Sequence, residues 1–189
     1  MKFKSWKLVM FGVFLVHANH SRAADITWTN ASGGNWSSAG NWNPNQIPGL
    51  GDNAFITNNG SYTVAVTISA DANANSVMLG GTSGTQTLAV SGGTFTLAAA
   101  SSVGSQGSLT FSGGTLAGSG ALTISGMLNW SGGVMAGTGR TILSNGTTAN
   151  FSGAGVKGLN RTFDNSGTVT YGGTILTFGY GAAVARRLH

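Results

Sequence analysis

The sequence reads LAVSGGT at residues 88–94, LTFSGGT at residues 109–115 and LNWSGGV at residues 128–134. Two weaker copies follow, ANFSGA at residues 149–154 and VTYGGT at residues 169–174. Successive copies place their large apolar residue at steps of 21, 19, 21 and 20 residues. These residues are Val90, Phe111, Trp130, Phe151 and Tyr171. A recurring period of this length indicates a repeat architecture.

Each copy has the alternation of a short strand with one buried side. In residues 109–111, Leu109 and Phe111 point inward and Thr110 points outward. The Gly pair then turns the chain, and a second short strand such as residues 95–97 or 122–124 completes the period. A candidate earlier copy ends at residues 66–69.

Short strands that recur every twenty residues fit a chain that winds once per repeat and stacks each turn on the previous one. The sequence therefore predicts an all-β protein, a parallel β-helix (β-solenoid) with coils of about 20 residues. Equivalent residues stack at the strand spacing of roughly 4.8 Å, so Val90, Phe111, Trp130, Phe151 and Tyr171 would form one internal ladder. A β-sandwich is the alternative, although it does not require the same Ser-Gly-Gly word in each strand.

The segment ahead of the repeats is rich in tryptophan. It contains ITWTN at residues 26–30, GGNWS at residues 33–37, NWN at residues 41–43 and IPGLGDNAFI at residues 47–56. One interpretation is an N-terminal cap, in which these aromatic side chains cover the open end of the first coil. The other is a binding surface, in which exposed rings stack on sugars. The candidate sugar-stacking residues are Trp28, Trp36 and Trp42.

This Trp-rich start resembles the opening of the passenger regions of bacterial autotransporter-associated repeat and filamentous-haemagglutinin-like β-helix proteins. The resemblance covers residues 26–180. It is carried by the W-x-N, GNW-x-x-x-x-NW and P-x-x-GD-x-A-x-I motifs of residues 26–56 and by the composition of the Gly-Ser-Thr repeats that follow. It implies a right-handed parallel β-helix, exported to the cell surface and often adhesive. Such passengers are usually followed by a sorting element, and none is recognisable here after residue 180.

The sequence divides into four segments. Residues 1–24 read as a signal peptide, with lysines before a short apolar run and a small-residue end, which predicts export by the general secretory route. A permanent membrane anchor is the alternative, but the run is about half of the roughly 20 residues that span a bilayer. Residues 25–56 form the predicted cap, residues 57–180 the β-helix repeats and residues 181–189 an irregular tail.

The charge balance argues against nucleic acid as a partner. The net charge of +5 arises mainly from the leader and the last four residues. Without residues 1–24, five basic residues face four Asp, so no basic stripe remains for binding phosphates. The five are Arg140, Lys157, Arg161, Arg186 and Arg187. We expect no stable membrane insertion of the mature chain.

The inventory of reactive side chains is small. The chain has no Cys and no Glu, and its histidines are His17, His20 and His189. This predicts no metal site, no cofactor and no enzymatic activity. The carboxylates are Asp25, Asp52, Asp71 and Asp164. We expect them in turns or caps, with Arg161 and Asp164 as a surface pair of small energetic worth.

The sequence thus favours a secreted or cell-surface, non-enzymatic structural or adhesive β-helix module. It would be the N-terminal part of a bacterial passenger protein and would act through a long, rigid polar surface. Its partners would be surface glycans, or a host or neighbouring cell surface. The alternative function is a carbohydrate-binding or polysaccharide-cleaving module. Exposed, coplanar Trp28, Trp36 and Trp42, or two Asp within catalytic range, would favour that alternative.

Overall fold

A computed structural model describes residues 23–67 and 70–179. Within these ranges the protein is a β-solenoid, with three parallel sheets running along its length and no α-helix. Six complete coils of three strands each follow a first coil that contributes no strand to the third sheet. The signal peptide predicted at residues 1–24 falls almost wholly outside the described residues, as does the tail predicted at residues 181–189. No helix among the described residues is long and apolar enough to cross a membrane.

The three sheets each collect one strand from every complete coil. Sheet A consists of β1 (Asp25–Trp28), β3 (Trp42–Asn43), β4 (Asn53–Ile56), β7 (Ser76–Leu79), β10 (Ser101–Val103), β13 (Leu122–Ile124), β16 (Arg140–Leu143) and β19 (Thr162–Asn165). Sheet B consists of β2 (Gly34–Asn35), β5 (Tyr62–Val66), β8 (Gln86–Val90), β11 (Gly107–Phe111), β14 (Met127–Trp130), β17 (Thr148–Phe151) and β20 (Thr168–Tyr171). Sheet C consists of β6 (Ala72–Ala74), β9 (Thr94–Leu97), β12 (Thr115–Ala117), β15 (Gly133–Met135), β18 (Lys157–Leu159) and β21 (Leu176–Phe178).

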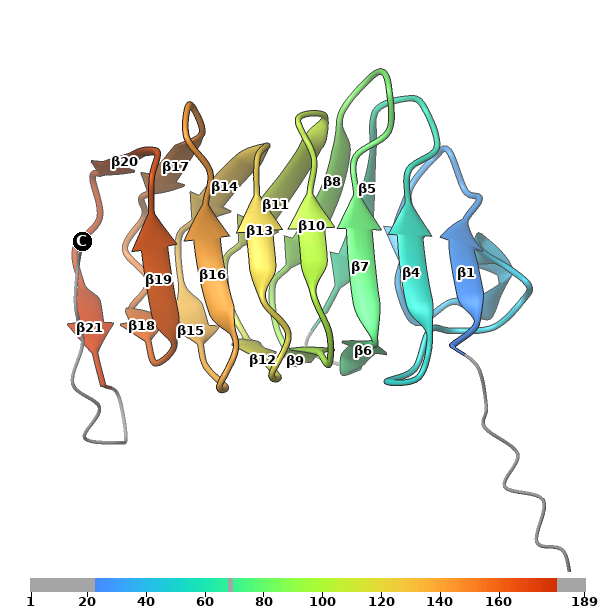
Figure 1. Cartoon of the computed structure of the whole chain (residues 1–189), viewed down its shortest axis with the longest axis horizontal. Coiled ribbons are helices and arrows are strands. Elements are labelled where there is room, and N and C mark those ends of the chain that lie inside the picture. Colours follow the sequence, from blue (N-terminus) through green and yellow to red (C-terminus); the bar gives the residue numbers. More distant parts are fainter. Residues whose placement is uncertain (1–22, 68–69, 180–189) are drawn as a thin grey trace, which may run out of the picture.

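The winding is right-handed (Figure 1). The strands of sheet A run upward at the front, the chain crosses over the top to sheet B at the back, and it returns through sheet C at the bottom while advancing from β1 towards β21. This handedness is the one that nearly all crossovers between parallel strands adopt. The predicted fold class is therefore confirmed.

The predicted ladder register is also confirmed. Val90 pairs with Phe111, Phe111 with Trp130, and Trp130 with Phe151. The candidate earlier copy belongs to the same column, because Val66 pairs with Val90. Tyr171 pairs with Phe151 and ends the column.

The core is one continuous apolar cluster that runs inside the coils from Ile26 to Phe163. Inward side chains of all three sheets meet there, and neighbouring aromatic rings of successive coils contact one another. Phe151 is 4% exposed, whereas Tyr171 is 49% exposed. The prediction that Tyr171 is internal is wrong, because no further described coil lies above it.

The Ser-Gly-Gly motif lies where the chain crosses from sheet B to sheet C, and the geometry of this crossing explains its glycines. The second glycine of the word has a positive φ in three successive coils, +63° at Gly93, +73° at Gly114 and +90° at Gly133. A Cβ on Gly114 would also lie 2.5 Å from the carbonyl oxygen of Gly93 in the coil below. Both the backbone conformation and the close stacking of coils therefore require glycine.

The N-terminal end of the solenoid is closed. Strand β3 pairs antiparallel with β1, with Trp28 opposite Trp42, and so covers the outer edge of sheet A. Trp42 Nε1 donates a hydrogen bond to the carbonyl oxygen of Trp36 at 2.8 Å. The first coil thus has a cap made of its own aromatic residues.

Candidate functional site

The candidate sugar-stacking residues Trp28, Trp36 and Trp42 are core residues. They are 0%, 1% and 1% exposed, and their rings meet edge to face rather than coplanar. Trp36 also packs edge-on against Phe95, at a ring-centroid distance of 5.5 Å. The sugar-stacking interpretation is therefore wrong. Burying three large rings at the end of the core stabilises the first coil more than leaving them in water would.

The carboxylates are spread along the chain. Asp52 accepts a hydrogen bond from the Gly49 backbone N–H at 2.9 Å, and Asp71 accepts one from the Thr94 N–H at 2.6 Å. Both therefore order turns or coil corners, as the sequence predicts. Asp25, on β1, accepts a hydrogen bond from the Asn53 side chain. No group of three or more metal-ligating side chains occurs within residues 23–67 and 70–179.

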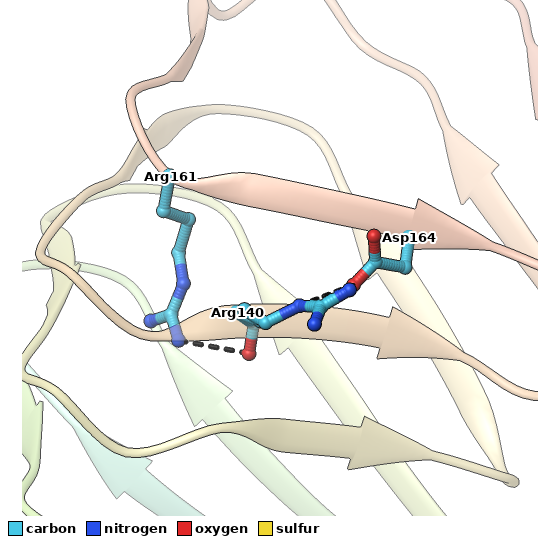
Figure 2. A network of polar contacts seen from close by, with 3 residues as sticks. All are labelled: Arg140, Arg161 and Asp164. Atoms are coloured by element: carbon cyan, nitrogen blue, oxygen red, sulfur yellow. Dashed lines mark hydrogen bonds and ion pairs between the residues drawn. The ribbon is translucent and has the colours of Figure 1, made fainter. Parts of the chain in front are cut away.

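Asp164 has a different partner from the predicted one. It lies on β19 and forms an ion pair with Arg140 on the adjacent strand β16, whose Nε donates to it at 2.7 Å. Figure 2 shows the Arg161 guanidinium bonded to the backbone carbonyl oxygen of Arg140 and away from Asp164. The predicted pair of Arg161 with Asp164 is wrong, because Arg140 and Asp164 are outward neighbours in the sheet, whereas Arg161 lies at a coil corner.

Arg161 is buried and bonds to backbone carbonyls of the two coils below it. Its Nη2 donates to Gly120 O at 2.8 Å and to Arg140 O at 2.9 Å, and its Nη1 donates to Ala136 O at 3.4 Å. Burial lowers the pKa of Arg161 to about 10, so the guanidinium is still charged at pH 7. It joins the corners of three successive coils.

Lys157 is a second buried cation, and it also donates hydrogen bonds to backbone carbonyl oxygens. Its ammonium donates to Gly155 O at 2.9 Å and to Gly153 O at 3.3 Å. The register places Lys157 opposite Gly133 of the coil below. Likewise, Arg161 is the equivalent of Gly139 in the coil below. A Cβ added to Gly139 would lie 2.5 Å from Arg161 Nη2. Both cations therefore fill space that small residues leave at the corners.

A signal for these buried cations was present in the sequence. When the repeats are aligned, Lys157 and Arg161 replace glycines of the preceding coil. A charged residue at a glycine position of a repeat indicates a special environment, and composition alone does not reveal it.

The outer side of sheet B carries a regular polar surface. We call its outward residues on β8, β11, β14, β17 and β20 the polar face. They form two columns that the register aligns from coil to coil. One column consists of Thr87, Ser108, Met127, Thr148 and Thr168, of which Ser108 is only 7% exposed, and the other of Ala89, Thr110, Asn129, Asn150 and Thr170. Eight of these ten residues are Ser, Thr or Asn, and none is charged.

The polar face is held in place by its own contacts and by the core beneath it. Asn150 Nδ2 donates to Asn129 Oδ1 at 3.1 Å, which links two successive coils. Adjacent coils repeat at roughly 4.8 Å and alternate residues of a strand at roughly 6.7 Å, so hydroxyl and amide groups recur on a regular grid. Such a grid suits a partner that also presents repeated hydroxyl groups.

These features define a parallel β-solenoid protein with a capped N-terminal end and an uncharged polar face. Comparison of the chain with protein-family models, with curated proteins and with solved structures finds no match.

Proposed function

We propose that the chain is an exported, non-enzymatic adhesive or structural module that acts outside the cell through the polar face. The observation that carries the proposal is the polar face itself, two in-register columns in which eight of ten residues carry a hydroxyl or amide group, on a continuous core. Neutral donors and acceptors of this kind hydrogen-bond to glycans without needing charge. The lysine-rich, apolar start of residues 1–24 supports export.

The resemblance of residues 26–56 to autotransporter and haemagglutinin-like passengers supports the same proposal. In this view the buried cap and the cation-filled corners keep the coils in register, and the polar face contacts surface glycans or a neighbouring cell. The Trp-based carbohydrate-binding alternative lacks the exposed rings that it requires.

Placing two arginines on the polar face should abolish binding if the face makes the contact. The double variant Thr148→Arg with Thr168→Arg changes two exposed side chains of adjacent strands in one column. We expect its binding to immobilised glycans or to whole cells to fall at least about tenfold, because each bulky cation separates the two surfaces. Biolayer interferometry on a panel of polysaccharides measures this loss.

The matched control is the double variant Ser38→Arg with Thr162→Arg, which adds the same two charges at exposed positions outside the polar face. It should bind as the unaltered protein does. Equal loss in both variants would place the contact elsewhere, and an unaltered protein that binds no glycan and no cell would contradict adhesion.

Purified protein should leave polysaccharides intact, and a chelator should not change its melting temperature. The expectation follows from the roles of the carboxylates, since Asp52 and Asp71 each hold a turn or corner and Asp164 is bonded to Arg140. Reducing-sugar release and thermal melting with and without EDTA measure the two effects. Turnover that disappears in Asp52→Ala or Asp164→Ala would support the polysaccharide-cleaving alternative instead.

A further inference from the structure

The chain contains two Asn-Gly pairs, both in turns that lead from sheet A to sheet B. Asn59-Gly60 lies between β4 and β5, and Asn145-Gly146 lies between β16 and β17, in the loops at the top of Figure 1. All four residues are exposed. In such a pair the glycine nitrogen follows the asparagine side chain directly, and no Cβ on the glycine obstructs a close approach. The two pairs therefore share one chemistry, and their surroundings decide which of them reacts.

The Asn59 pair is held by the next coil. Asn59 Oδ1 accepts hydrogen bonds from Thr82 N–H at 3.0 Å, from Thr82 Oγ1 at 2.9 Å and from Ser83 N–H at 3.2 Å. The Gly60 N–H donates to Ser83 O at 3.2 Å. Both groups that would have to meet are thus bonded to the coil above, and they stay apart until these hydrogen bonds open.

The Asn145 pair lies in a turn that leaves both groups unbonded. Thr147 N–H donates to Ser144 O at 3.2 Å, and Gly146 has a φ of +77°, as in a type II turn. Among the described residues, neither the Asn145 side chain nor the Gly146 N–H has a hydrogen-bond partner. A Cβ added to Gly146 would meet no atom within 4 Å, so this turn has room for the asparagine side chain to fold back on the glycine nitrogen.

We propose that Asn145 is a site of spontaneous deamidation, with water as the co-reactant. The Gly146 backbone nitrogen attacks Cγ of Asn145 and forms a new N–Cγ bond. The Cγ–Nδ2 bond breaks, and Nδ2 leaves as ammonia with the proton that the glycine nitrogen has lost. Water then opens the resulting succinimide. Cleavage of the new N–Cγ bond gives aspartate, and cleavage of the original peptide bond gives isoaspartate, whose main chain runs through Cγ.

The products differ from the unaltered chain in charge and, for isoaspartate, in the length of the turn. Either product carries a carboxylate just before Thr148, at the edge of the uncharged polar face. The residues on both sides of the pair are bonded to neighbouring coils. Ser144 N–H donates to Ile124 O of the coil below, and Thr147 O accepts from Thr168 N–H of the coil above. We therefore expect the solenoid to stay folded after the reaction.

Incubation of the full, folded chain in mildly alkaline buffer tests the proposal. Trypsin releases residues 141–157 and chymotrypsin releases residues 56–62, so mass spectrometry follows the two pairs in separate peptides. We expect Asn145 to be converted at least about tenfold faster than Asn59, because the Asn59 pair must first open its hydrogen bonds. Electron-transfer fragmentation separates aspartate from isoaspartate, and a digest taken before incubation gives the background.

The matched variants are Asn145→Gln and Asn59→Gln, since glutamine keeps the amide but places it one carbon farther along the side chain. Ion exchange of the aged chain should resolve an acidic species that Asn145→Gln largely removes and Asn59→Gln retains. Equal conversion of the two pairs in the folded chain would overturn the proposal, as would an acidic species that persists in Asn145→Gln. Concentrated urea should bring the two rates close together, and a difference that persists there would rule out the turn as its cause.

Discussion

Replacing Trp130 by Ala is expected to lower the free energy of unfolding by about 3–5 kcal/mol, the range for a large aromatic residue in a packed core. Trp130 is fully buried at the middle of the sheet B ladder. Its ring contacts Phe151 edge to face at a centroid distance of 5.0 Å and lies 6.3 Å from Phe111. The substitution removes contacts to the coils above and below at once.

A hydrogen bond adds to this effect. Trp130 Nε1 donates to Gly132 O at 3.0 Å, so alanine leaves this carbonyl at the corner without its indole donor. The neighbouring coils cannot close the resulting cavity easily, because their spacing is fixed by the sheet ladders on three sides. Urea denaturation followed by circular dichroism measures the loss of stability.

Asn129→Ala is the matched control for the ladder. Asn129 is the adjacent residue on β14 but faces outward, where it accepts one hydrogen bond from Asn150. We expect a loss of only about 0.5 kcal/mol. A shift of register by one residue would exchange the two results, and equal small losses would contradict an internal ladder.

The sheet B ladder could be predicted because its signal is local and repeated. An apolar residue two positions before a glycine pair recurs in three successive coils, so the period, the inward side and the pairing of Phe111 with Trp130 all follow from the sequence. Tyr171, which directly precedes a glycine pair, has a similar signal and a different outcome. Its exposure depends on what lies beyond the last described coil, and the repeat itself does not encode that.

The third strand of each coil could not be predicted from the sequence pattern. The sequence predicts two strands per repeat and takes residues 95–97 and 122–124 as equivalent. The structure places residues 95–97 in β9 of sheet C and residues 122–124 in β13 of sheet A. The remaining strand of a coil is short and partly polar, as in the SSV sequence of β10, and its pairing comes from the stack rather than from its own pattern.

The Trp-rich start shows that residue type alone does not predict whether a side chain is buried or exposed. Its two interpretations, a cap and a sugar-binding surface, use the same side chains and differ only in exposure. Exposure depends on β3 folding back antiparallel on β1, a long-range pairing that no motif specifies. The sequence predicts a polar surface but not its location. The location depends on which of the three sheets aligns its outward polar residues from coil to coil.

Replacing Arg161 by Met is expected to lower the free energy of unfolding by about 2–3 kcal/mol. The change removes a charged donor from Gly120 O and Arg140 O, and hydrogen bonds to charged groups contribute about 1.5–3 kcal/mol each. The cost of keeping the guanidinium out of water offsets part of this gain, and the methionine side chain fills part of the same space. The net loss should therefore be smaller than the two hydrogen bonds together.

Arg140→Met separates this role from a general effect of charge. Arg140 is 58% exposed in its side chain and holds only the surface pair with Asp164, so its replacement should cost about 0.5 kcal/mol or less, and less still at high salt. If Arg161 were the surface partner that its sequence position suggests, the two variants would be equally mild. Urea midpoints of both variants, at low and high salt, decide between these outcomes. A large, salt-independent loss for Arg161→Met alone is the result expected of a cation that holds three coil corners together from inside.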